Sequence, residues 1–237
     1  MTIPIAEIFG PTVQGEGAVI GSKTMFIRVT GCDFSCFWCD SKFAWAMGNS
    51  VDMAAQEIFD RVLWQGGLNF DTVTITGGNP AMISDEMRQL IDLFHEEGIH
   101  VALETQGSIW QDWMHDCDIT AISPKPPSSG QPFDEVVLKK IARHLEGDAW
   151  FVKVVVFDDE DYEFAKKVFD LVRPYKAQLF LQVGNIMIRN EDLAEQRKAL
   201  LEKLDWLIQK VLMEPRMNNV VVLPQLHTLL YGNRQGV

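Results

Sequence analysis

Short apolar runs alternate with amphipathic stretches along almost the whole chain. The strand-like runs cover residues 25–31, 72–78, 99–105, 118–124, 150–157, 177–183 and 219–224. Helical patterns cover residues 52–64, 85–97, 134–145, 159–172 and 191–212. Strand–helix–strand alternation is typical of a mostly parallel α/β sheet or barrel. About six strands are too few for a closed eight-stranded barrel, which needs ~250 residues. We therefore predict an open, partial TIM-like barrel.

No Gly/Ser-rich linker, repeat or low-complexity tract divides these 237 residues. We therefore predict one domain that spans residues 1–237, with a short C-terminal extension from about residue 213. Ligands of such folds bind at the carboxyl ends of the strands. Polar and Gly-rich segments follow four of the predicted strands, at residues 76–80, 104–107, 123–125 and 182–185. We expect these four segments to face one site.

The charge balance argues against a nucleic-acid partner. The chain carries 21 Lys and Arg against 33 Asp and Glu, a formal net charge of −12, and negative charge repels a phosphate backbone.

No apolar run approaches the ~20 residues that cross a bilayer, and the N-terminal segment lacks the pattern of a signal peptide. We expect a cytoplasmic protein that contacts neither nucleic acid nor membrane. In that reducing compartment its thiols are free to bind metal.

Three of the four cysteines, Cys32, Cys36 and Cys39, fall within eight consecutive positions. A structural zinc site usually has four protein ligands, whereas this C-x3-C-x2-C loop provides three thiolates and no histidine. Three thiolates suit three irons of a [4Fe–4S] cube, which leaves the fourth iron open to a non-protein ligand. A zinc site, or buried cysteines that act as small apolar side chains, are the alternatives. The fourth cysteine, Cys117, is better explained as a half-buried structural thiol.

The cysteine spacing, directly after a predicted strand, resembles the radical S-adenosylmethionine (SAM) superfamily. The resemblance implies one [4Fe–4S] cluster per subunit, whose open iron is chelated by the amino and carboxylate groups of SAM. Reduction of the cluster then cleaves SAM to a 5′-deoxyadenosyl radical. Trp38, the residue before the last cysteine, matches the aromatic position that packs near the adenine in that superfamily. A simple aromatic anchor for the loop is the alternative.

A set of longer motifs narrows the resemblance to the 7-carboxy-7-deazaguanine synthase family. The motifs occur in order over most of the chain: EIFGPTVQGEG, FIRVTGC, CDS, TGGNP, ETQGS and SPKPP, with LPQLHTLLYGNRQGV at the C-terminus. The family converts 6-carboxy-5,6,7,8-tetrahydropterin to 7-carboxy-7-deazaguanine, with loss of ammonia, in queuosine biosynthesis. The resemblance further implies Mg2+ as a cofactor, flavodoxin or a similar protein as the one-electron donor, and a homodimer.

Several residues near the N-terminus have the chemistry to bind a pterin. Gln14 offers a donor and an acceptor, and Glu16 can accept from the guanidine-like edge of the ring; a surface turn is the alternative. Arg28 lies within a strand, where an unpaired charge is costly. Its forked guanidinium suits the substrate carboxylate, and a structural salt bridge is the alternative. The expected substrate contacts are Val13, Gln14, Gly15, Glu16, Arg28, Thr76, His227 and Val237.

Residues after the third cysteine and after the later strands are assigned to Mg2+ and SAM by the resemblance. It implies that the Ser41 hydroxyl binds Mg2+, an ion that keeps other coordination positions for water or substrate oxygens; a helix N-cap at Asp40 or Ser41 is the alternative. This chain has Asn79 where the family usually has Glu, so Asn79 would accept from the SAM ammonium without charge assistance and SAM would bind less tightly. Glu104 is expected to hold the ribose hydroxyls or to orient Asn79. The expected SAM contacts are Trp38, Cys39, Asp40, Gly78, Asn79, Glu104, Ser123, Pro124, Lys125, Gln182, Val183, Gly184 and Asn185.

The resemblance also implies a mechanism, in which the cofactor carries the hard chemistry and the protein positions it and excludes water. The radical takes a hydrogen from C6 of the substrate, the ring contracts, the hydrogen returns, SAM re-forms and ammonia leaves. The sequence singles out no Asp, Glu or His as a general base. The alternatives are an activating enzyme that makes a glycyl radical on a partner protein, a zinc-binding interaction module, and a family member without turnover. For Lys125 and His227 an ordinary loop side chain is the alternative.

Overall fold

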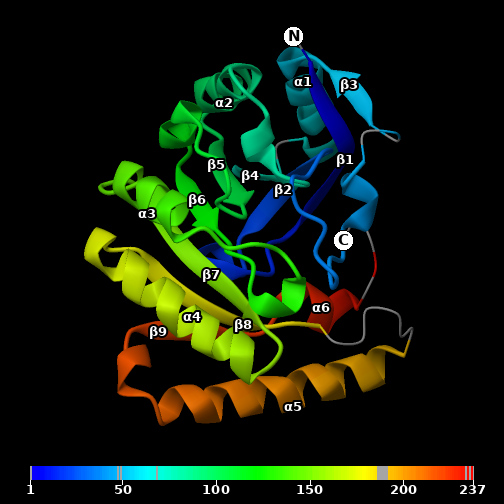
Figure 1. Cartoon of the computed structure of the whole chain (residues 1–237). Coiled ribbons are helices and arrows are strands. Elements are labelled where there is room, and N and C mark those ends of the chain that lie inside the picture. The colour runs from blue at the N-terminus through cyan, green and yellow to red at the C-terminus, as the bar shows by residue number, and fades with distance from the viewer. Residues whose placement is uncertain are drawn as a thin grey trace.

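The computed structural model describes residues 2–46, 48, 50–67, 69–185, 192–232, 234 and 236. Its centre is a curved sheet, which in these residues has nine strands in the order β3-β1-β2-β4-β5-β6-β7-β8-β9 (Figure 1). The strands are β1 (Ile3–Val13), β2 (Lys23–Val29), β3 (Val51–Met53), β4 (Thr72–Gly77), β5 (His100–Thr105), β6 (Ile119–Ile122), β7 (Trp150–Val156), β8 (Gln178–Val183) and β9 (Val220–Leu223). From β2 through β9 the neighbours in the sheet are parallel, while β1 is antiparallel to β2 and β3.

The sheet is open, because its edge strands β3 and β9 do not pair with one another in the described part of the chain. The prediction of a partial barrel of mostly parallel strands is therefore confirmed. All seven predicted strand runs form strands, β2 and β4 to β9. The sequence did not predict β1 or β3, and the predicted C-terminal extension contains β9, which pairs with β8.

Helices cover the outer side of this sheet (Figure 1). They are α1 (Ala55–Gly66), α2 (Glu86–Glu96), α3 (Glu135–His144), α4 (Asp159–Val172) and α5 (Leu193–Leu212), and the short α6 (Leu226–Tyr231) follows β9. In α2 the buried residues are Met87, Leu90, Ile91 and Phe94, a spacing that places one apolar stripe against the sheet. Among the described helices, none has both the length and the apolar character that crossing a bilayer requires.

The apolar core lies mainly between the sheet and its helices. One buried cluster includes side chains of α1 and α2, and a second includes side chains of α3, α4 and α5. A third, small cluster of Ala121, Phe151 and Phe180 packs against Ala18. Gly17, the residue before Ala18, has φ = 60°. A Cβ atom on Gly17 would lie 2.2 Å from the Phe151 ring. Only glycine therefore lets the β1–β2 connection lie so close to β7.

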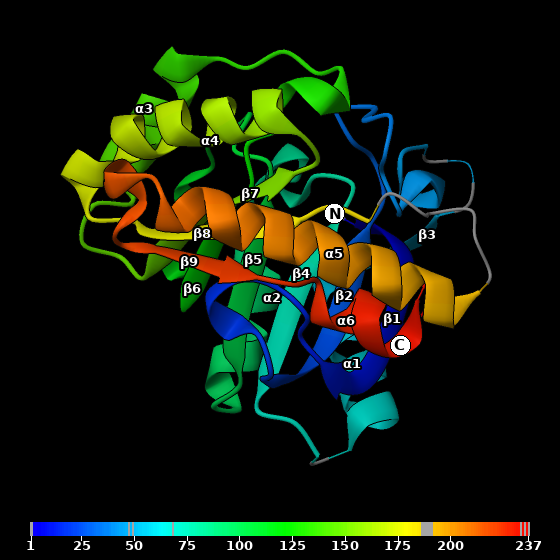
Figure 2. The ribbon, with the colours of Figure 1, turned by 90° about the horizontal axis from the view of Figure 1, so that it is seen from below.

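The C-terminal segment packs against the β1–β2 connection on one side of the molecule. In Figure 2, α5 runs along β8 and β9 and packs against α6. The backbone N–H of Leu226 donates to the carbonyl of Gly15 at 3.0 Å. The C-terminal segment thereby lies beside the β1–β2 connection.

Candidate active site

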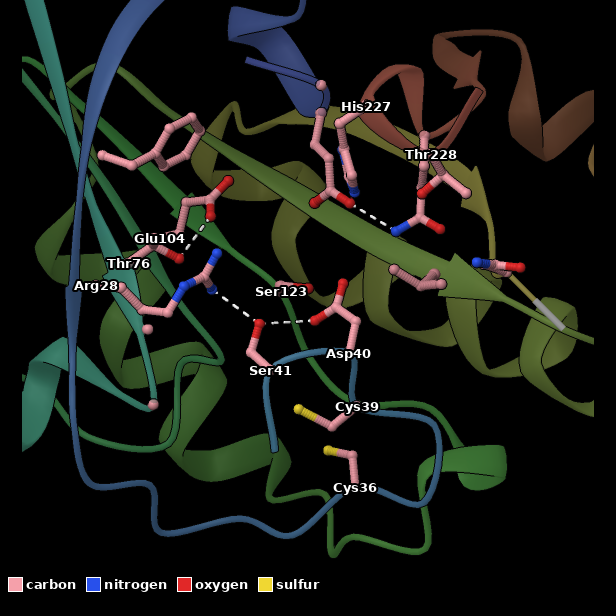
Figure 3. A pocket seen from close by; sticks show the side chains of 18 of the residues that line it. Arg28, Cys36, Cys39, Asp40, Ser41, Thr76, Glu104, Ser123, His227 and Thr228 are labelled. Carbon is pink, nitrogen blue, oxygen red and sulfur yellow. Dashed lines mark hydrogen bonds between the residues drawn. The ribbon is translucent and has the colours of Figure 1, made fainter. Parts of the chain in front are cut away.

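A cavity of about 450 Å³ lies at the carboxyl ends of the parallel strands. Its wall comes from distant parts of the chain: the β1–β2 connection, the cysteine loop of residues 31–41, the ends of β4 and β5, and the C-terminal segment (Figure 3). Most residues predicted for the site line it: Val13, Gln14, Gly15, Glu16, Arg28, Cys32, Cys36, Trp38, Cys39, Asp40, Ser41, Thr76, Gly78, Glu104, Ser123, Lys125, Asn185 and His227. The fold thus brings together residues that are up to about two hundred positions apart, as expected for strand-end loops of one sheet.

Five of the residues predicted to contact SAM do not line the cavity: Asn79, Pro124, Gln182, Val183 and Gly184. The Gln182 side chain is buried and donates to the carbonyl of Pro224 at 3.0 Å, which joins the ends of β8 and β9. Val183 is also buried, at the end of β8. Val237, a predicted substrate contact, lies outside the described residues.

The three cysteines of the loop share this cavity wall. Burial raises the pKa of each thiol, to about 11 for Cys36, while the Lys125 ammonium opposes this effect at all three. Within the described residues, no three His, Cys, Asp or Glu side chains converge on a single-ion site. Three thiols that line one cavity without meeting at one point fit the separate irons of a [4Fe–4S] cube better than they fit a zinc ion.

Backbone contacts hold the cysteine loop against the segment after β4. The N–H of Asn79 donates to the carbonyl of Gly31 at 2.7 Å. A Cβ on Gly78 would lie 1.9 Å from that carbonyl oxygen. Glycine at position 78 is therefore required for the close approach of the two segments, a reason that the sequence motif alone did not give.

Asn79 and Glu104 do not take up the arrangement expected from the sequence. Asn79 is fully buried, and its Oδ1 accepts from the Thr105 hydroxyl at 2.7 Å and from the Ala81 N–H at 3.2 Å. Its Nδ2 donates to Asp33 at 2.8 Å and to Ser108 at 3.1 Å. The amide is thus used inside the protein, where it fastens the cysteine loop to the loops after β4 and β5.

Glu104, in contrast, faces the cavity. It accepts from the Thr76 hydroxyl at 2.8 Å and from Gln14 Nε2 at 3.2 Å, and no contact to Asn79 is found among the described residues. Of the two roles expected for Glu104, direct orientation of Asn79 has no supporting contact among these residues. The carboxylate instead orients two of the predicted substrate contacts.

Arg28 is both paired and exposed to the cavity. Its Nε donates to Glu7 at 2.8 Å, and its Nη1 donates to the Ser41 hydroxyl at 2.8 Å. Ser41 in turn donates to Asp40 at 2.9 Å, as the dashed lines in Figure 3 show. The ring of Phe9 lies 5.7 Å from the guanidinium carbon. The salt bridge and the cavity-facing position, which the sequence presented as alternatives, therefore coexist.

A buried network surrounds Glu16. Its carboxylate pairs with the Lys153 ammonium and accepts from Gln225 Nε2 at 2.7 Å. Burial lowers the pKa of Lys153 to about 7. His227 lines the same part of the cavity, and burial lowers its pKa as well. A Cβ on Gly15 would lie 2.2 Å from His227 Nδ1, so this glycine makes room for the imidazole.

Four cavity or loop residues were missed by the sequence reasoning: Glu7, Gln106, Lys153 and Gln225. Lys153 carried a usable signal, because a charge inside the otherwise apolar run 150–157 resembles the position of Arg28 in its strand. Gln106 donates to Cys32 Sγ at 3.6 Å and to Asp33 at 2.5 Å. Gln106 lies in the strand-end segment 104–107, which was expected to face the site, and Glu7 and Gln225 lie in two of the family-like motifs, but the sequence reasoning assigned no role to any of the three.

Comparisons with known proteins show which family this chain resembles over its whole length. The family model for the radical SAM superfamily matches residues 26–118. The chain is 49% identical to a 7-carboxy-7-deazaguanine synthase of Bacillus cereus, over 99% of both chains. It is 47% identical to the enzyme of the same name from Bacillus subtilis, over 99% of this chain and 98% of that one.

A solved structure shows the same fold. The crystal structure of QueE from Escherichia coli superposes with a TM-score of 0.67 at 22% identity, over 95% of each chain. The comparisons favour neither the glycyl-radical activating enzyme nor the zinc-binding module. The chain belongs to the 7-carboxy-7-deazaguanine synthase family of radical SAM enzymes.

Proposed function

We propose that this chain converts 6-carboxy-5,6,7,8-tetrahydropterin to 7-carboxy-7-deazaguanine, with ring contraction and loss of ammonia. Membership of the radical SAM superfamily implies a [4Fe–4S] cluster and SAM. The proposal is carried by one observation: the three thiols, the Arg28 guanidinium and the Glu16 carboxylate line the same cavity. A carboxylated pterin needs a cation for its acid group and an acceptor for its guanidine-like edge.

The chain's own residues would bind the two ligands at different parts of the cavity. SAM would lie beside the cysteine loop, and Trp38, Gly78, Ser123 and Lys125 are among its predicted contacts that line the cavity. When bound, the cluster and SAM supply the radical that abstracts hydrogen from the substrate. The protein orients the two ligands and excludes water.

The pterin would lie between Arg28 and His227. Arg28 would pair with the substrate carboxylate, and Glu7 would hold the guanidinium in place. Glu16, itself fixed by Lys153 and Gln225, would accept from the pyrimidine edge. In this proposal no Asp, Glu or His side chain acts as a general acid or base.

Mg2+ is part of the same proposal. The Ser41 and Asp40 oxygens lie 2.9 Å apart at the cavity wall, and oxygen ligands are those that Mg2+ prefers. Ser41, with Asp40 beside it, would hold the ion, which would clamp the substrate or act as a Lewis acid. We further propose a single domain, a cytoplasmic homodimer, and flavodoxin or a similar protein as the electron donor.

An anaerobic assay tests the substrate. The protein is reconstituted with iron and sulfide and incubated with dithionite, SAM, Mg2+ and the pterin, and the product is measured by mass spectrometry. We expect 7-carboxy-7-deazaguanine from the native chain and none from Cys36→Ala. Cleavage of SAM without conversion of the pterin would overturn the proposed substrate, and a colourless protein that holds zinc would overturn the cluster as well.

A further inference from the structure

The Trp38 indole is held from two sides at the wall of the cavity. Its ring packs against Phe157, with the ring centroids 4.9 Å apart and the planes tilted by 36°. Its Nε1–H donates to the Ser128 hydroxyl at 3.0 Å. An indole that is fixed both at its face and at its polar edge has little freedom to rotate.

The Ser128 hydroxyl continues the hydrogen-bond chain to a buried carboxylate. It donates to Asp161 Oδ2 at 2.6 Å. The direction of both bonds is settled by chemistry, since an indole N–H only donates and an ionised carboxylate only accepts. Asp161 is the third residue of α4 and is fully buried.

Asp161 also fixes the second residue that touches the indole. Its Oδ2 accepts from the backbone N–H of Phe157 at 2.9 Å, and its Oδ1 accepts from the backbone N–H of Ser128 at 3.0 Å. One carboxylate therefore sets the relative positions of the stacking partner and of the hydrogen-bond partner of Trp38.

Helix capping does not explain the buried charge. Asp158 already caps α4, because its side chain accepts from the backbone N–H of Asp161 at 2.9 Å. A buried carboxylate is costly unless several donors satisfy it. Here three donors do so, and all three belong to Ser128 or Phe157. The cysteine loop is fastened to the same segment by the Phe37 N–H, which donates to the Ser129 carbonyl at 3.0 Å.

We propose that Ser128 and Asp161 are positioning residues for SAM, because they hold the Trp38 indole in a fixed orientation next to Cys39 before SAM binds. The inference deepens the proposed function, since it rests on the use of SAM at this cavity. It does not depend on which pterin is converted. SAM then binds to a surface that is already ordered, because the entropy cost of fixing the indole is incurred during folding.

Matched variants of Ser128 and Trp38 test the relay. Ser128→Ala removes the hydroxyl, Ser128→Thr keeps it, and Trp38→Phe keeps an aromatic ring without the N–H donor. Ser84→Ala is the control, because Ser84 lies before α2 and its hydroxyl donates to the neighbouring Glu86. Urea unfolding of each variant separates a change in SAM binding from a loss of folding.

Two measurements are made on these proteins. In the protein without cluster, the Trp38 indole N–H resonance is the one absent from Trp38→Phe. We expect it to shift in Ser128→Ala and to keep its position in Ser128→Thr and Ser84→Ala. In the cluster-loaded protein, we expect the SAM Kd to rise about five- to tenfold in Ser128→Ala and in Trp38→Phe, the size of one lost hydrogen bond.

The double variant decides between a relay and two separate effects. If Ser128 acts through Trp38, Ser128→Ala combined with Trp38→Phe raises the Kd no further than either change alone. Additive effects, or an unchanged Kd in Ser128→Ala despite a moved indole signal, would overturn the proposal.

Asp161→Asn should raise the SAM Kd by a similar factor, because either orientation of the amide places its NH2 group opposite a backbone N–H. Since the Kd is measured without the pterin, failure of the proposed substrate leaves this test intact.

Discussion

Arg28 donates to the hydroxyl of Ser41 at 2.8 Å and, from the other side of the same guanidinium, to the carboxylate of Glu7 at 2.8 Å. The residue proposed for the substrate carboxylate is therefore in direct contact with the residue proposed for Mg2+. A ligand that carries both a carboxylate and a metal-binding oxygen would engage both at once. Glu7 keeps the guanidinium aligned in the absence of that ligand.

This relationship predicts the effect of removing the Glu7 charge. Glu7→Gln keeps the size of the side chain and weakens a charge-assisted hydrogen bond worth about 1–2 kcal/mol. We expect the KM for the pterin to rise about five- to twentyfold, with kcat changed less than about twofold, in steady-state rates of product formation. Glu135→Gln is the control, because Glu135 is paired with Lys167 on the helical surface. A fall in kcat at unchanged KM would contradict the role of Glu7.

Gly15→Ala should displace the C-terminal segment and thereby distort the site. The added Cβ would lie 2.2 Å from His227 Nδ1 and 2.8 Å from the His227 backbone nitrogen, so α6 must move. Overpacking of this kind costs about 1–3 kcal/mol, and we expect the activity to fall more than about tenfold. Gly48→Ala, where the Cβ meets no atom within 4 Å, should leave the activity and the urea midpoint unchanged.

His227 should make the free energy of unfolding depend on pH. Burial lowers the pKa of the folded imidazole, whereas the unfolded chain takes up a proton near its ordinary pKa of about 6.5. Because the unfolded state binds more protons below that pH, stability falls as the pH falls, by at most ~1.4 kcal/mol per pH unit from this group. His227→Gln should remove this part of the slope in urea titrations at pH 7.5, 6.5 and 5.5. Equal slopes for the two proteins would show that the buried imidazole is not the cause.

Asn79→Asp should create a pair of carboxylates. The amide nitrogen that donates to Asp33 at 2.8 Å would become an oxygen, and two such carboxylates share a proton with a raised pKa. The folded pair then binds a proton that the unfolded chain releases near pH 4, so its stability falls as pH rises. We expect Asn79→Asp to be about 2–3 kcal/mol less stable at pH 8 than the native chain and closer to it at pH 5.

A second substitution, at Asp33, provides the control. Asp33→Asn, combined with Asn79→Asp, restores one carboxylate and one amide and should recover most of the stability at pH 8. If the double variant remains as unstable as Asn79→Asp alone, the contact between the two side chains is not the origin of the loss.

The sequence predicted best those features that depend on hydrophobic periodicity or on position at the end of a strand. The helix predicted over residues 159–172 is α4, and the four polar strand-end segments supply residues to one cavity. Strand β1 was missed because Gly10 and Pro11 interrupt its apolar pattern. Its register with β2 shifts between Phe9 and Thr12, and β3 pairs only with Ile3 to Ile5, so Pro11 removes no hydrogen bond on that side.

Roles that depend on partners far apart in the chain could not be predicted. The motif around Asn79 suggested a ligand contact, but the side chain is used by Asp33, Ser108 and Thr105. Asp161 looked like one acid among several at the start of a helix, and only burial next to Ser128 distinguishes it. Such assignments require the distance between side chains, which spacing along the sequence does not contain.

The contact between Gly15 and the segment that begins at Leu226 has a consequence for biosynthesis. A ribosome makes the chain from its N-terminus, so the β1–β2 connection emerges long before the residues that cover it. The Glu16 carboxylate acquires its Gln225 partner only when nearly all of the 237 residues have been made. A nascent chain that stalls before that point can carry the complete cysteine loop, yet it has no finished cavity in which a bound radical would be kept from solvent.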